Sequence, residues 1–281
     1  MLWARKRPAE PAPRSAAEIA AAELPLTLDA GLFGQHFVSL LESVTACGGV
    51  ERCLERLVAK QELCAATLTA ARERDLESEE IGRVLGFVFT ARRHLLPALD
   101  ELGAQRRAGL IRDLGDVAVP LTSRLQRFVD AMPGARSMDR ADVSAAARLR
   151  RAAWNFAAEM VHFGDPARFP LMSRWVWDSA SQSGALREFV RGNDVMREIP
   201  FDNSAELYEG ARAWLSGRIA ERGIYRDVPL WIDLVLAQAY VSYLRSMANG
   251  SLGGEFARGA APHEQLTKLL GIDSEGGRPP K

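Results

Sequence analysis

Apolar residues recur at three- and four-residue steps through most of this chain, which is the spacing of one face of an α-helix. The stripe is clear between Leu32 and Val44, and Gly48-Gly49 ends it, since glycine adopts the backbone conformation that a helix C-terminus needs. The same periodicity predicts further helices at about 50–74, 77–102, 103–116, 120–131, 204–222, 229–248 and 262–270, and a long helix that ends near residue 163. The predicted fold is therefore all-α, with orthogonal or bundle-like packing of many helices.

Breaks in this pattern predict how the chain is organised. Pro97 should kink or end the helix over 77–102, because proline lacks the backbone donor of a helix interior. A stretch rich in Pro, Gly, Ser and Asp around 133–142 predicts a linker. We therefore expect two helical halves that can share one core, with ends that do not fold: a leader at 1–28, an N-terminal region at 29–132, the linker at 133–142, an aromatic-rich C-terminal region at 143–272 and a tail at 273–281.

The periodicity is weakest between residues 164 and 204. Pro166 and Pro170 punctuate its start, and a helix carrying Trp175 and Trp177 is expected to follow. Residues 181–204 are predicted to form a loop, within which 184–191 fits either a helical turn or an edge strand. Loops of this length inside a compact domain are usually functional or disordered.

Composition narrows the class of protein. The chain has 281 residues, 47% hydrophobic and 26% charged, and a formal net charge of zero, which argues against a dedicated nucleic-acid binder. Lysine is rare and arginine abundant, a bias typical of GC-rich bacterial coding sequences. Three cysteines without a dense framework favour a reducing compartment, and no apolar run is long enough to span a bilayer. We therefore expect a cytoplasmic bacterial protein.

Ligand-like spacing occurs at Glu159 and His162, which share one helix face because they are three residues apart. Carboxylate-bridged di-iron bundles use this Glu-x-x-His step twice, and no second copy exists here. The cysteines are too widely spaced for the common zinc or iron–sulfur patterns. We therefore predict no metal and no cofactor, and interpret His162 first as a partly buried histidine bonded to a carbonyl or to Asp165.

A second possible site lies among polar residues of the C-terminal half. Asp233 stands within an apolar run, where a carboxylate costs free energy unless it is paired, exposed or functional. A helical enzyme or a protein binding a small ligand or metal would place its site between C-terminal helices, and the candidate side chains are Glu159, His162, Asp165, Asp178 and Asp233. The sequence shows no Gly-x-Ser-x-Gly nucleophile motif and no phosphate loop.

Tryptophan and arginine gather in the same half of the chain. Trp175 and Trp177 are two residues apart, so on a helix they would face different sides, and protein interfaces are enriched in aromatic residues and arginine. The alternative is a helix buried between two layers. The leading hypothesis is a non-catalytic accessory protein that binds a protein partner. The binding surface would be formed by Arg168, Arg174, Trp175, Trp177 and Arg187. The hypothesis also allows a homo-oligomer.

A third hypothesis is association with nucleic acids. Basic pairs such as Arg92-Arg93 and Arg150-Arg151 would support nucleic-acid association only if they formed a phosphate-contacting stripe. Residues His162–Val176 resemble the helix–loop–helix junction of helix-hairpin-helix DNA glycosylases. The position that corresponds to the family's catalytic aspartate falls near Ser173, and the Gly-rich hairpin is absent, so the resemblance does not imply that activity.

Overall fold

The computed structural model describes residues 24–250 and 260–273, and within these ranges the chain is α-helical with no β-strand. This confirms the predicted all-α class. No helix in the described ranges is long and apolar enough to cross a membrane. The helices are α2 (Ala30–Thr45), α3 (Val50–Glu73), α4 (Ser78–Gly86), α5 (Leu95–Glu101), α6 (Ala104–Leu114), α7 (Leu121–Asp130), α8 (Arg140–Gly164), the 3₁₀ helix η1 (Ala185–Phe189), α9 (Ala205–Ala220), α10 (Val228–Gly250) and α11 (Pro262–Leu269).

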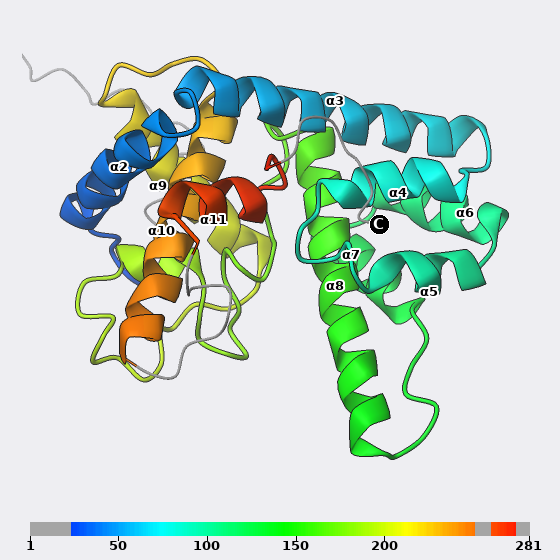
Figure 1. The fold of residues 1–281 in the computed structure, drawn as a ribbon. Helices are drawn as coiled ribbons and strands as arrows, with labels where there is room; N and C mark the ends of the chain where they lie inside the picture. The colour runs from blue at the N-terminus through cyan, green and yellow to red at the C-terminus, as the bar shows by residue number, and fades with distance from the viewer. Residues whose placement is uncertain (1–23, 251–259, 274–281) are drawn as a thin grey trace, which may run out of the picture.

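The helices form two groups that α3 connects (Figure 1). In one group α10 packs against α2, α9, α11 and η1, and in the other α8 packs against α3 and α7. Helix α2, from the N-terminal half of the sequence, thus lies with the C-terminal helices. The buried apolar side chains of both groups form one continuous cluster, so the two halves share a core.

Side-chain caps mark the starts of several helices. The Asp29 carboxylate accepts hydrogen bonds from the backbone N–H groups of Gly31 and Leu32, at 2.7 and 3.0 Å, at the start of α2. Asp139 caps α8 and Ser204 caps α9 in the same way. These caps satisfy backbone donors that have no partner within the helix.

The helix predicted over 77–102 is wrong in one respect, because it is divided into α4 and α5 by turns at 87–94. Pro97 explains the division. In a continuous helix its ring would clash with the carbonyl of Arg93, whereas in the first turn of α5 its missing N–H has no cost.

The expected helix around Trp175 and Trp177 is also wrong, since residues 165–184 form turns with a single bridge between Asp178 and Ser183. The loop at 181–204 is confirmed. Within it, residues 184–191 are expected to form either a helical turn or an edge strand, and η1 shows that they contain a helical turn. Of the predicted leader, residues 24–28 pack against the core, where Leu28 is buried, and residues 1–23 lie outside the described ranges. The predicted tail lies outside them from residue 274 onward.

Gly271 allows the chain after α11 to pack closely against the turn after α4. Its φ is +72°, and a Cβ atom added there would lie 1.8 Å from the carbonyl oxygen of Phe87. We expect Gly271→Ala to lower the free energy of unfolding by about 2–4 kcal/mol, because a left-handed conformation and a backbone clash both oppose the methyl group. Urea denaturation followed by circular dichroism measures the change.

Gly103→Ala is the matched control for this prediction. Gly103 has a similar φ of +76°, but no atom lies within 4 Å of the added Cβ. It should therefore cost only the conformational part, about 1–2 kcal/mol. Equal losses in the two variants would show that the contact with Phe87 contributes nothing.

Candidate functional site

The five carboxylate and histidine candidates do not form one site. Glu159 pairs with Lys60, His162 pairs with Asp233, and Asp178 pairs with Arg174. Asp165 is exposed, and one of its carboxylate oxygens accepts a 3.2 Å hydrogen bond from the backbone N–H of Arg168. The structure therefore brings together only His162 and Asp233 in direct contact.

Lys60 and Glu159 form a buried ion pair between α3 and α8. The Lys60 Nζ atom lies 2.6 Å from Glu159 Oε2 and donates a 2.9 Å hydrogen bond to the carbonyl of Leu270, beyond α11. The ammonium also lies 4.1 Å from the centroid of the Phe163 ring. Both side chains are almost fully excluded from water, with exposures of 0% and 2%. The pair thus joins three separate segments.

Burial and the charge of Lys60 act in opposite directions on the pKa of the Glu159 carboxyl. Burial raises the pKa of the Glu159 carboxyl, and the positive charge of Lys60 opposes this effect only in part. The indole of Trp175 is close enough to lower the pKa slightly, yet neither Trp175 Nε1 nor Glu159 Oε1 forms a full hydrogen bond. Glu159 therefore has one satisfied oxygen and one unsatisfied oxygen.

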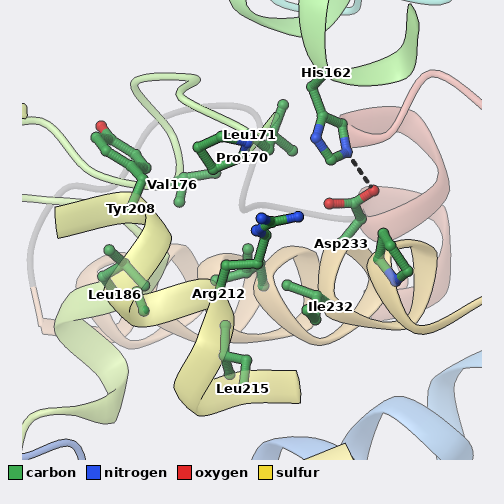
Figure 2. Close-up of a pocket in the computed structure, with 13 residues that line it drawn as sticks. His162, Pro170, Leu171, Val176, Leu186, Tyr208, Arg212, Leu215, Ile232 and Asp233 are labelled. Atoms are coloured by element: carbon green, nitrogen blue, oxygen red, sulfur yellow. Dashed lines mark hydrogen bonds and ion pairs between the residues drawn. The ribbon is translucent and has the colours of Figure 1, made fainter. Parts of the chain in front are cut away.

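His162 and Asp233 form a second buried pair, between the end of α8 and the start of α10 (Figure 2). His162 Nε2 lies 2.9 Å from Asp233 Oδ2, and His162 Nδ1 lies 2.8 Å from the carbonyl oxygen of Phe169. A carbonyl oxygen can only accept, so Nδ1 carries a proton. Nε2 then also needs a proton unless the carboxyl of Asp233 supplies it. The pair therefore holds two protons, one on Nδ1 and one between Nε2 and the Asp233 carboxylate.

The pocket beside this pair is narrow and mostly apolar. Its walls come from the end of α8, the turns at 170–176, α9 and α10, and Figure 2 shows Arg212 reaching into it from α9. It contains about 350 Å³ of space between atoms, of which only about 20 Å³ is accessible to water. Asp233, 1% exposed, keeps its Oδ1 atom without a hydrogen bond. Both nitrogens of His162 are engaged, so the ring has no free atom to act on a substrate.

Trp175 and Trp177 belong to the core, which corrects the expected aromatic surface. They are 4% and 1% exposed, because residues on both sides of the turn cover them. Tyr240 of α10 packs against Trp175, and Phe201 packs against Trp177. The burial that the alternative expected is thus what the structure shows for these two side chains, but they lie in turns and not in a helix.

The arginines of the expected surface have different environments. Arg187 is also structural, because its guanidinium donates to the carbonyls of Gln182, Asn193 and Met196 and so holds the loop after η1. Arg168 is exposed, and Arg174 forms a 2.6 Å ion pair with Asp178. Of the five residues expected to bind a protein, Arg168 is therefore exposed, and Arg174 and Arg187 are partly exposed.

Arg174 and Asp178 line a polar cleft that we call the arginine cleft. Its water-accessible volume is about 360 Å³, and its walls come from the 87–94 turns, α8, the turns at 174–183 and α10. The charged and histidine side chains that line it are His94, Arg148, Arg151, Arg174 and Asp178. Three guanidinium groups thus face a cleft that contains one carboxylate.

Sequence reasoning missed Lys60, His94 and Arg148 as site residues. Lys60 lies three residues after Leu57 and four before Cys64 on the buried stripe of α3, and a lysine in such a stripe is the signal of a buried partner. Arg148 and Arg151 are three residues apart on α8, so they lie on one helix face. Within the described ranges, no three His, Cys, Asp or Glu side chains are grouped so as to hold a metal ion.

Comparison with known proteins adds no relative: no protein-family model, no curated protein and no solved structure matches this chain.

Proposed function

We propose that this chain is a non-catalytic interaction protein, and that its arginine cleft binds an acidic segment of a protein partner. The observation that carries the proposal is an excess of unpaired positive charge in a concave surface. In the described part of the chain, the side chains of Arg151 and His94 have no hydrogen bond or ion pair, and the guanidinium of Arg148 donates only to the hydroxyl of Ser144. Only Arg174 already has a carboxylate partner.

The form of the cleft favours an extended acidic segment over a small molecule that is fully enclosed. The cleft is wide and open to solvent, and its walls come from four separate segments of the chain. Clusters of arginine recognise acidic and phosphorylated motifs because each guanidinium can grip a carboxylate with two parallel hydrogen bonds. Tyr240, half-buried and stacked on Tyr243 at 6.0 Å, adds an aromatic wall.

The non-catalytic part of the proposal is supported by the hydroxyl groups in the cleft. The Ser181 hydroxyl bonds Asp178 and Ser183, at 2.9 and 2.8 Å, and in the described part of the chain neither serine hydroxyl has a hydrogen bond to a histidine. A serine nucleophile needs a neighbouring base, most often histidine. The cleft is thus equipped to bind charge, and its hydroxyl groups support the turn at 178–183.

We place this interaction in the bacterial cytoplasm. Cys47, Cys53 and Cys64 are all free thiols. Burial raises the pKa of the Cys53 thiol to about 11 and that of Cys64 to about 12, which keeps both in the unreactive protonated form. Free thiols of this kind are typical of proteins from a reducing compartment.

The test is binding of a fluorescent octapeptide of glutamate and aspartate, measured by anisotropy, with the matching glutamine and asparagine peptide as the neutral probe. We expect the acidic peptide to bind, and the variant Arg148→Ala/Arg151→Ala to weaken binding by at least about tenfold, since two charge-assisted contacts are lost. Arg106→Ala, an exposed arginine of α6 outside the cleft, is the control and should bind like the wild type.

Three outcomes would contradict this proposal. The first is that the double variant binds the acidic peptide as tightly as the wild type does. The second is that the neutral peptide binds as tightly as the acidic one. The third is that a single-stranded oligonucleotide binds more tightly than the acidic peptide, with a steep salt dependence. The last outcome would favour the nucleic-acid hypothesis. If no peptide binds, the second candidate is a small-ligand protein that uses the pocket beside Asp233, because the unpaired Oδ1 atom there can accept a hydrogen bond from a ligand.

A further inference from the structure

Arg124, on α7, is a buried arginine without a carboxylate partner. It is only 4% exposed, and its Nη1 atom donates a 2.7 Å hydrogen bond to the carbonyl of Leu114. Its Nε atom is buried with no hydrogen-bond partner, and no ion pair or hydrogen bond involves Nη2 in the described part of the chain. The Nε–Nη2 edge, which is the edge that grips carboxylates and phosphates with two bonds, is therefore free.

The surroundings add more positive charge. The guanidinium of Arg124 lies 4.8 Å from the centroid of the Phe169 ring, and that of Arg168 lies 5.2 Å from the same centroid. Two positively charged guanidinium groups thus lie close to the same aromatic ring. Burial lowers the pKa of Arg124, and the nearby charge of Arg168 lowers it further, while Asp116 acts in the opposite direction. Neither Arg124 nor Arg168 forms an ion pair with a carboxylate in the described ranges.

These arginines line a cleft with room for a ligand. The Arg124 cleft has a water-accessible volume of about 220 Å³ and lies between α3, the connection from α6 to α7, the end of α8 and the turn that follows it. Arg72 of α3 is the third arginine in its wall, and its Nη2 atom donates to the carbonyl of Gly115 at 3.1 Å. One carboxylate, that of Asp165, also lines the cleft, and one of its oxygens is bonded to the backbone N–H of Arg168.

We propose that the Arg124 cleft is a binding site for a phosphate group, either inorganic phosphate or the phosphate of a small monoester. A buried positive charge is costly unless it is paired, and a dianion held by Arg124, Arg168 and Arg72 supplies that pairing. The free edge of Arg124 would form the two parallel bonds, and the exposed arginines would close over the remaining oxygens. This site shares no residue with the arginine cleft.

The experiment is isothermal titration of the full chain with inorganic phosphate and, separately, with phenyl phosphate, supported by thermal unfolding with each ligand. We expect saturable binding at one site, and Arg168→Gln should weaken it by at least about tenfold. Arg168 is exposed, so this variant should fold normally. Tighter binding of phenyl phosphate would identify a monoester as the ligand, and equal affinity would identify inorganic phosphate.

Arg124→Met gives an independent readout. It replaces a buried charge by an apolar side chain of similar length, so it should fold and lose the stabilisation by phosphate. Arg151→Gln, in the arginine cleft, should bind phosphate like the wild type, which separates this site from the proposed function. Absence of binding at millimolar phosphate, equal binding by Arg168→Gln, or equal stabilisation of Arg124→Met would overturn the proposal. If chloride stabilised the chain as much as phosphate does, the proposal would also be overturned, because the stabilisation would then be a general effect of salt.

Discussion

Lys60→Met is expected to lower the free energy of unfolding by about 3–5 kcal/mol near neutral pH, because it leaves the carboxylate of Glu159 buried without its charge partner. Methionine fills nearly the same volume, so the loss comes from charge and hydrogen bonding more than from packing. The same substitution also leaves the carbonyl of Leu270 without its 2.9 Å donor. Urea denaturation followed by circular dichroism at pH 7 gives the magnitude.

The pH dependence of this variant has a definite sign. Burial already raises the pKa of Glu159 above its ordinary value of 4.5, and removal of Lys60 takes away the main opposing effect. A group whose pKa is higher in the folded state binds its proton more tightly there. Stability is therefore greatest below about pH 4.5 for this group, and it falls as the pH rises through the folded-state pKa. The penalty of Lys60→Met should shrink as the pH is lowered from 7 toward 5.

The matched control is the double variant Lys60→Met/Glu159→Met. An apolar pair of similar volume often replaces a buried ion pair with little loss, so the double variant should recover most of the stability and lose the pH dependence between 5 and 7. A double variant as unstable as Lys60→Met at both pH values would show that the loss does not come from an unpaired carboxylate at Glu159.

Sequence periodicity predicts the helices well where burial is local and one-sided. In α2 and α9 the apolar stripe and the cap lie within the same stretch of chain, so both ends could be located from the residues. The turns around Trp175 and Trp177 could not be predicted in the same way. Trp175 and Trp177 are buried by segments distant in sequence, and a pair of tryptophans two residues apart has no periodicity that distinguishes a turn from a helix.

The candidate sites show the same limit. Both His162 and Asp233 could be singled out, one by helix spacing and one by its apolar neighbours, but their contact spans 71 residues and depends on how α8 and α10 cross. The pairing of Glu159 with Lys60 spans 99 residues and depends on the packing of α3 on α8. Residue type thus indicates that a buried charge needs a partner, and only the packing of the helices identifies which partner it has.

Asp233→Ala is expected to destabilise the chain by about 3 kcal/mol or more, because it leaves His162 Nε2 buried and unpaired between α8 and α10. Asp233→Asn should cost only about 1 kcal/mol. With Nδ1–H bonded to the carbonyl of Phe169, a neutral His162 presents Nε2 as an acceptor, and the amide of asparagine can donate to it. Urea denaturation of the two variants at neutral pH measures the difference.

The proton count of the pair explains why these two variants should differ and supplies a second measurement. In Asp233→Asn, nitrogen NMR of the His162 ring should show a proton on Nδ1 alone, because Nε2 has become the acceptor of the amide. Asp194→Asn, an exposed carboxylate in the loop after η1, is the control and should change stability little. If Asp233→Asn were as damaging as Asp233→Ala, the contact would require the charge of an imidazolium and carboxylate pair, and hydrogen bonding alone would not be enough to hold α8 against α10.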